Sequence, residues 1–176
     1  MKIVAIVQAH MGSTRLPNKV MKLINGVPMI EILLRRLGKS KKLDQIVLAT
    51  SVDVNDQVLT GHVESLGFKC TQGSKNDVLE RYVQAAKENQ ADVIVRITGD
   101  CPLVDPVLVD ECISKFIESK VDYLSNTIPP TYPDGLDVEV MGYKTLKKAD
   151  EEAKKLFHRE HVTPYIHESN FFSKNN

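Results

Sequence analysis

Short apolar segments rich in β-branched residues alternate with segments of helical periodicity along most of this chain, and this alternation constrains the fold more than any other feature. The segments that read as strands are residues 3–8, 45–51, 67–72, 92–98, 122–126 and 136–141. Apolar residues recur at helical spacing in residues 28–37, 55–66, 77–89 and 105–119. A repeated order of strand and helix predicts an α/β fold built around a parallel, doubly wound sheet.

The same order predicts where a ligand binds. In open α/β sheets the ligand lies in the crevice beyond the carboxyl ends of the strands. The loops that follow Gln8, Ser51 and Thr98 should therefore converge on one site. A further segment, residues 128–135, holds three prolines and an Asp-Gly pair, so it is predicted to be a loop. This loop is either a plain connector or a cover over an acceptor pocket.

Composition excludes several classes of protein. A chain of 176 residues suits a single domain, residues 1–176. Basic and acidic residues both number 23, so the charge gives no argument for binding nucleic acid or an anionic membrane. No apolar run approaches the roughly 20 residues of a membrane span. An odd count of three cysteines, without a CxxC pair, predicts reduced thiols in a soluble cytoplasmic protein.

The loop after the first predicted strand has the residues of a polyphosphate-binding turn. Gly12 lets the backbone approach a ligand closely, so that successive N–H groups can point at phosphate oxygens. Arg15 adds a planar cation and Lys19 a mobile one. The loop has neither the GxxxxGK[ST] nor the GxGxxG pattern. It therefore predicts a phosphate site of another type, and the alternative is a polar surface loop.

A second group of polar residues ends the fourth predicted strand. Gly99-Asp100 would place a carboxylate in the ligand crevice, and one carboxylate with phosphate oxygens and waters is a normal Mg²⁺ site. The alternative is that Asp100 only closes the strand as a turn residue. Asp105, followed by Pro106, reads as the cap of the next helix.

Three further groups have weaker chemical signals. Ser74 and Asp77 resemble a helix-capping box, and ligand contact is the alternative. The histidines of residues 158–167 lack the HExxH spacing of a zinc site, so they are predicted to be salt-bridged or capping residues on the surface. Cys101 has no evident activating base nearby and is predicted to be a small buried residue.

The ordered motifs of the chain resemble one protein family. Residues 8–20, QAHMGSTRLPNKV, are similar to the opening motif of the cytidylyltransferases, which include the synthases of CMP-activated 3-deoxy-manno-octulosonate and acylneuraminate. Residues 96–105, 132–140 and 159–165 resemble, in the same order, the branch called spore-coat polysaccharide biosynthesis protein F. The similarity covers nearly the whole chain.

The resemblance implies a three-layer, Rossmann-like nucleotide-diphospho-sugar transferase fold with a mostly parallel sheet. It also implies CTP as donor, a sugar or sugar acid as acceptor, Mg²⁺ as cofactor and a possible homodimer. By the family pattern Arg15, Lys19 and Asp100 are catalytic, and Asp100 holds the metal. The nucleotide-binding residues implied by the same pattern are Ala9, His10, Met11, Gly12, Ser13, Arg15, Lys19, Ser74, Asp77, Arg81 and Gly99.

Two departures from the family pattern bear on activity. The family usually has arginine where this chain has His10, which replaces a permanent cation by a group that is only partly charged near neutral pH. Relatives also continue beyond the equivalent of residue 176 and supply a second metal carboxylate, so the chain is expected to be short at its C-terminus. Asp137, on a predicted strand, is a possible substitute for that carboxylate.

The leading hypothesis is cytidylyl transfer from CTP with release of pyrophosphate. Such a reaction needs mainly positioning and charge neutralisation, and the sequence assigns no general base. One alternative is a glycosyltransferase that uses a nucleotide sugar, although such enzymes usually carry an Asp-x-Asp pair where this chain has Gly99-Asp100. The other alternative is a nucleotide-binding relative without catalysis.

Overall fold

A seven-stranded sheet forms the centre of the computed structural model, which describes residues 1–176. Its strand order is β5-β4-β1-β6-β8-β7-β9. The strands are β1 (Ile3–Gln8), β4 (Gln45–Ser51), β5 (Lys69–Gly73), β6 (Val93–Thr98), β7 (Tyr123–Ser125), β8 (Glu139–Gly142) and β9 (Lys174–Asn175). The helices are α1 (Met29–Leu37), α2 (Gln57–Ser65), α3 (Val78–Glu88), α4 (Pro106–Ser119), α5 (Tyr143–Glu152), α6 (Leu156–His161) and α7 (Pro164–Glu168). A separate hairpin joins β2 (Leu23–Ile24) to β3 (Val27–Pro28).

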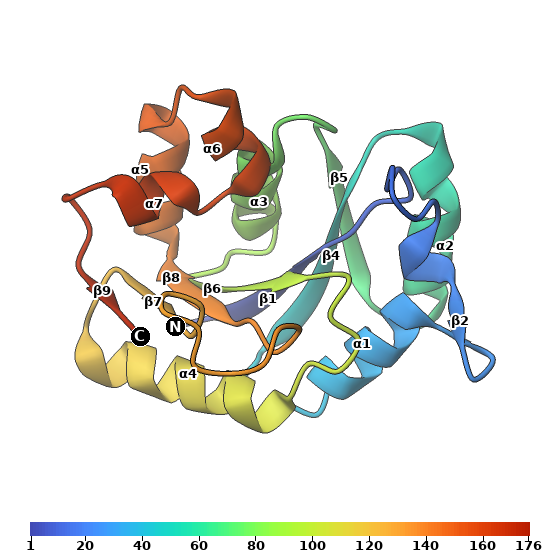
Figure 1. Cartoon of the computed structure of the whole chain (residues 1–176), viewed down its shortest axis with the longest axis horizontal. Coiled ribbons are helices and arrows are strands. Elements are labelled where there is room, and N and C mark those ends of the chain that lie inside the picture. Colours follow the sequence, from blue (N-terminus) through green and yellow to red (C-terminus); the bar gives the residue numbers. More distant parts are fainter.

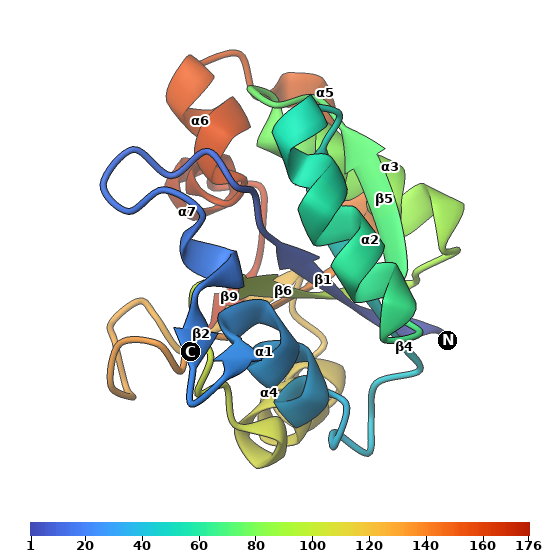
Figure 2. The same ribbon diagram turned by 90° about the vertical axis from the view of Figure 1, so that its right-hand side faces the viewer.

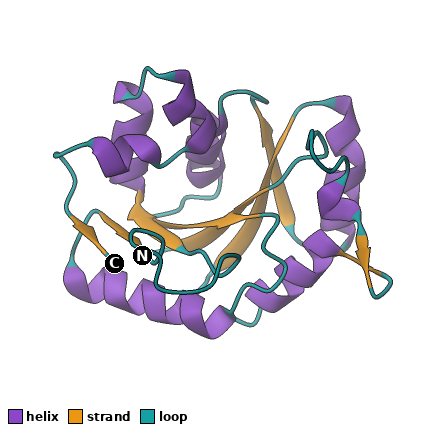
Figure 3. Cartoon of the chain, viewed as in Figure 1, coloured by secondary structure: helices purple, strands orange, loops and turns teal.

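Helices cover both faces of the sheet (Figures 1 and 3). Alternate residues of β1 enter two different cores, because successive side chains of a strand point to opposite faces. Ala5 packs with the apolar faces of α1, α2 and α4, whereas Ile6 packs with α3, α5 and α7. A strand that is buried on both faces reads as a continuous apolar run, which explains the composition of β1. The predicted three-layer α/β architecture is confirmed.

The sheet is parallel in its first half and mixed in its second. β5, β4, β1 and β6 run parallel, but β8 is antiparallel to both β6 and β7. β8 begins at Glu139, not at residue 136, because the Asn126 side chain binds the Leu136 carbonyl and the Val138 amide, at 2.8 and 2.9 Å. Asp137 therefore precedes the strand, and its placement on a strand was wrong.

The last three helices were not predicted from the sequence. α6 and α7 are short, and all three helices pack through a few apolar residues such as Leu146 and Ile166. His158 was predicted to lie on the surface, but it is buried, and its Nε2 lies 3.0 Å from a Glu168 oxygen.

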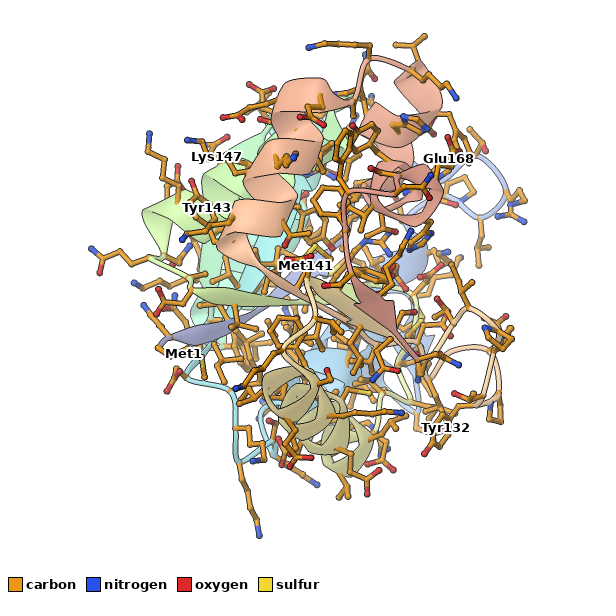
Figure 4. All side chains as sticks on the ribbon, turned by 90° about the vertical axis from the view of Figure 1, so that its left-hand side faces the viewer. Met1, Tyr132, Met141, Tyr143, Lys147 and Glu168 are labelled. Carbon is orange, nitrogen blue, oxygen red and sulfur yellow. The ribbon has the colours of Figure 1, made fainter.

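None of the helices is both long and apolar enough to cross a bilayer. Figure 4 shows Tyr143 and Lys147 of α5 above the sheet and Tyr132 below it.

The direction in which the chain crosses the sheet changes between β1 and β6. β1 leads through α1 to β4 on one side, whereas β6 is reached from β5 by way of α3 and pairs with the other side of β1. Gln8 lies opposite Thr98, so both strands end at the same level. Such a switch point opens a crevice outside the strand ends. The loop after β1 lies on the same side of the molecule as α6 (Figure 2).

Candidate active site

A cavity of about 480 Å³ occupies this switch point. We call it the loop cavity, because the loop after β1 forms most of its wall. It is lined by Gln8, Ala9, His10, Gly12, Ser13, Thr14, Arg15, Lys19, Val20, Arg96, Thr98, Gly99, Asp100, Glu160 and His161. The structure thus brings the predicted loop and the predicted Gly-Asp strand end to one place.

Gly99 allows the ends of β1 and β6 to approach each other. Its N–H donates a 2.7 Å hydrogen bond to the Gln8 carbonyl. A Cβ atom at this position would lie 2.6 Å from the Ala9 Cβ and 2.7 Å from the Gln8 oxygen. Because no side chain fits there without a backbone shift, Gly99 sets the width of the crevice between the two strands.

The backbone amides of the loop divide into two groups. The Met11 N–H donates to Asp56 at 2.7 Å, and the Gly12 N–H donates to the His10 Nδ1 at 3.1 Å. The N–H groups of Ser13, Thr14 and Arg15 donate no hydrogen bond within the chain. Consecutive amides of this kind can bind phosphate oxygens. The amides without a partner therefore begin one residue after Gly12.

Asp56 is a structural residue of the site that the sequence analysis missed. It is only 2% exposed, and its carboxylate accepts hydrogen bonds from the Met11 N–H and from the N–H and hydroxyl of Ser51. It joins the loop after β1 to the end of β4. The only signal in the sequence is an acidic residue at the start of a predicted helix, which is usually a cap.

Replacing Asp56 by asparagine is expected to lower the free energy of unfolding by about 1–3 kcal/mol, because the amide group presents N–H atoms to buried donors. The loop should also bind a nucleotide more weakly. Urea unfolding and calorimetric titration with CTP measure the two effects. The matched control is Asp53→Asn, which changes a more exposed residue of the same segment and should leave both quantities near the wild-type values. Equal losses in both variants would contradict this role of Asp56.

Two of the three predicted catalytic residues form an ion pair. The Lys19 Nζ lies 2.7 Å from an Asp100 oxygen, and both side chains remain partly exposed. Partial burial opposes ionisation of Asp100, but the hydrogen bond and charge of Lys19 outweigh it and hold the pKa of Asp100 below its usual value. Arg15 lies on the same cavity wall and is exposed. The two cations of the loop and the Asp100 carboxylate therefore face the same space.

The residues around Asp100 fit a divalent cation that is shared with a phosphate ligand. No three His, Cys, Asp or Glu side chains are close enough together to hold a metal ion by themselves. Mg²⁺ is commonly bound by one or two carboxylates together with substrate phosphates and water. Asp100, which lines the same cavity as the three residues with unpaired amides and the two cations of the loop, would supply the protein part of such a site.

A second cavity of about 520 Å³ adjoins the loop cavity, and we call it the Arg81 cavity. The two share Gln8, His10, Glu160 and His161. Arg81 is 1% exposed, and its guanidinium donates to the Ser74 carbonyl at 2.7 Å. Its Nε is buried without a hydrogen-bond partner. The predicted nucleotide-binding residue Arg81 thus lines a cavity and has an unused donor.

Three other predicted nucleotide-binding side chains lie outside both cavities. Ser74 accepts from the Asp77 N–H at 3.0 Å, and Asp77 caps α3 by accepting from the Glu80 N–H at 3.0 Å. Asp77 also pairs with Arg159 at 2.7 Å. Met11 packs into the core below the loop. The helix cap is therefore Asp77, and the Ser74 hydroxyl binds only the Asp77 N–H ahead of the helix. Nucleotide contact by these side chains stays a prediction.

A buried polar network supports the other wall of the crevice. Arg96 of β6 forms an ion pair with Glu139 of β8, which is 5% exposed. Glu139 also accepts from the Tyr123 hydroxyl, and the His167 Nε2 lies 2.8 Å from that hydroxyl oxygen. Residues of β6, β7, β8 and α7 are therefore connected behind the site. Of these four side chains the sequence predicted a role only for His167, as a salt-bridged or capping residue on the surface, and it is partly buried here.

Comparison with known proteins places these motifs in one family. The family model described as cytidylyltransferase matches residues 4–174. The chain is 37% identical over 169 residues to the spore coat polysaccharide biosynthesis protein SpsF of Bacillus subtilis. The aligned residues cover 93% of this chain and 69% of that protein. It is also 32% identical over 120 residues to the 3-deoxy-manno-octulosonate cytidylyltransferase of Geotalea daltonii, and this alignment covers 67% of this chain and 46% of that protein.

Solved structures agree with this result. A cytidylyltransferase from Leptospira borgpetersenii superposes with a TM-score of 0.95 at 32% identity, covering 99% of this chain and 75% of that one. The shared fold therefore extends over nearly every element described above. Because the family model spans almost the whole sequence, this chain belongs to the cytidylyltransferase family.

Proposed function

We propose that this protein transfers a cytidylyl group from CTP to a sugar or sugar acid, with release of pyrophosphate, in the synthesis of a polysaccharide or another glycan. The observation that carries the proposal is the loop cavity, where three unpaired amides, Arg15 and Lys19 face Asp100. The family relationship supports CTP as the donor. A sugar-acid acceptor is supported by the name of the Geotalea daltonii relative.

The residues of the loop cavity would act by positioning and by neutralising charge. The amides of Ser13, Thr14 and Arg15 would bind the phosphates, and the two cations of the loop would offset their negative charge. A triphosphate gives the Lys19 ammonium a new partner, which frees the Asp100 carboxylate that it holds in the unliganded chain. Mg²⁺, when bound at Asp100, would further neutralise the charge of the phosphates.

His10 does not by itself argue against catalysis. Its Nδ1 accepts the hydrogen bond of the Gly12 N–H and so shapes the loop, although it brings no fixed charge. Arg15 and Lys19 still provide two permanent cations on the cavity wall. We therefore favour an active enzyme over a relative that only binds nucleotides.

We also propose that residues 1–176 act as one nucleotidyltransferase-like domain in the cytoplasm, and a homodimer stays a prediction. The three cysteines, Cys70, Cys101 and Cys112, are free thiols in the structure. Cys101 is buried as predicted, and burial raises the pKa of its thiol. Such a thiol is a poor nucleophile at neutral pH.

Calorimetric titration with CTP, UTP, ATP and GTP, with and without Mg²⁺, tests the donor and the metal together. CTP is expected to bind most tightly, and Asp100→Asn should remove the Mg²⁺-dependent part of its affinity. Asp105→Asn is the matched control, since asparagine also caps a helix. Equal binding of all four nucleotides would contradict the choice of donor. Undiminished Mg²⁺ dependence in Asp100→Asn would exclude Asp100 as the metal ligand.

A further inference from the structure

Two further cavities lie between the carboxyl end of β6 and the loop of residues 126–138. The Asp100 cavity, about 620 Å³, is lined by Thr98, Asp100, Cys101, Pro102, Leu103, Pro133, Asp134, Gly135, Leu136 and Asp137. The polar cavity, about 220 Å³, is lined by Arg96, Thr98, Thr127, Asp137, Glu139, Thr163 and His167, and by no apolar side chain. Thr98 lines both of these and also the loop cavity, so the three spaces meet at the carboxyl end of β6.

The chemistry of these walls differs from that of the loop cavity. The loop cavity has Arg15 and Lys19 on its wall, which suits a polyphosphate. The polar cavity presents hydroxyl and carboxyl groups, and its one cation, Arg96, is already paired with Glu139. Walls of this kind suit the hydroxyl groups of a sugar, which both donate and accept hydrogen bonds.

Asp137 is the carboxylate that these two cavities share. Two other carboxylates of the crevice wall are engaged: Asp100 with Lys19, and Glu139 with Arg96 and Tyr123. The Asp137 carboxylate accepts no hydrogen bond within the chain, although the residue is half-buried. Asp137 is therefore a free acceptor at the boundary between the sugar-compatible space and the space around Asp100.

We propose that the two cavities bind a polyhydroxylated acceptor and that Asp137 accepts the proton of its attacking hydroxyl group. The proposal rests on the proposed cytidylyl transfer and names the acceptor side of that site. The O–H bond of the acceptor breaks and the proton passes to the Asp137 carboxylate, while the oxygen forms a bond to the α-phosphorus. The bond from that phosphorus to the bridging oxygen breaks, and pyrophosphate leaves with the electron pair.

The surroundings of Asp137 suit a proton acceptor. Partial burial and the neighbouring charges of Asp134, Glu139 and Asp100 raise the pKa of Asp137, and Arg96 only partly opposes them. A general base is most effective when its pKa lies near the working pH. His167, which lines the same cavity, has a pKa lowered mainly by burial, so it adds no fixed positive charge against Asp137.

The test compares Asp137→Asn with Asp105→Asn, which removes the same charge from a residue that lines neither cavity and whose helix-capping role asparagine can keep. Pyrophosphate release is measured from pH 5 to 9 with CTP, Mg²⁺ and either 3-deoxy-manno-octulosonate or N-acetylneuraminate as acceptor. Asp137→Asn is expected to lower kcat by about 10²–10⁴-fold and to abolish the rise of the rate with pH on the acid side. CTP affinity should not change. Asp105→Asn should keep the rise of the rate with pH on the acid side and most of the rate.

Three results would overturn the proposal, and they differ from one another. If the Asp137→Asn variant keeps the wild-type rate and the rise of the rate with pH on the acid side, Asp137 does not accept the proton. The proposal of cytidylyl transfer would be unaffected by this result. A loss of Mn²⁺ affinity in the CTP complex of this variant, measured by electron paramagnetic resonance, would make Asp137 a metal ligand instead. Absence of pyrophosphate release by the wild type with both acceptors would contradict the proposed function as well.

Discussion

Replacing Lys19 by methionine is expected to slow pyrophosphate release by about 10²–10³-fold, the loss typical when one charge-stabilising group is removed from an active site. Methionine keeps much of the apolar stem of lysine but removes the ammonium group that pairs with Asp100. The charge of a leaving pyrophosphate would then be neutralised by Arg15 and the loop amides alone. The KM for CTP should rise as well, because the same cation binds the ground state.

Lys22→Met is the matched control for this measurement. Lys22 lies three positions further along, is exposed and does not line the loop cavity, so the variant changes the net charge equally. Steady-state kinetics and circular dichroism of both variants separate a local effect from a change of fold. A Lys19→Met enzyme with wild-type kcat would show that Lys19 only holds Asp100 in the unliganded chain.

Replacing Glu139 by glutamine is expected to lower the free energy of unfolding by about 3–5 kcal/mol, because it leaves a charge without its partner in the interior. Arg96, the partner, has a side chain that is only 15% exposed. The Tyr123 hydroxyl would also lose a charged acceptor. Urea unfolding measures the difference, with Glu151→Gln on the exposed face of α5 as control. If the free energy of unfolding falls no more than in the control, the Arg96 guanidinium must find water or another partner in place of Glu139, and the predicted cost of an unpaired buried charge would be contradicted.

The contribution of Glu139 to the free energy of unfolding also depends on pH. Burial opposes its ionisation, but the charge of Arg96 outweighs burial and the pKa of Glu139 is lowered. A carboxyl group with a lowered pKa stabilises the folded state fully above its unfolded pKa, about 4.3, and loses this contribution as the pH falls through the folded value. The stability difference between wild type and Glu139→Gln should therefore be constant near neutrality and shrink below about pH 4. A difference that grows on acidification would contradict this sign.

The central strands could be predicted from the sequence because each is buried on both faces. β1 and β4 begin and end at the predicted residues, and β6 differs only by one residue at its start. Their apolar runs are local signals that need no knowledge of their neighbours. The helix caps at Asp77 and Asp105 were predictable for the same reason, since a capping side chain binds an amide only two or three residues away.

The remaining boundaries and helices depend on contacts between distant residues. The start of β8 is set by Asn126, which binds the chain ten and twelve residues further on. α5, α6 and α7 are helices that depend on contacts with the sheet and with each other. Tertiary packing of this kind overrides local propensity in short elements. The burial of His158 follows from the same packing and was mispredicted for that reason.

The sequence by itself determined the parallel half of the sheet and the place of the loops after β1 and β6 at its carboxyl edge, because strand and helix periodicity are local properties of the chain. Only the tertiary structure decided which polar groups meet there. The ion pair between Lys19 and Asp100 joins residues 81 positions apart, and the hydrogen bond from the Met11 N–H to Asp56 joins residues 45 positions apart. Such pairings depend on strand register and on the crossing at the switch point, and no local pattern encodes them.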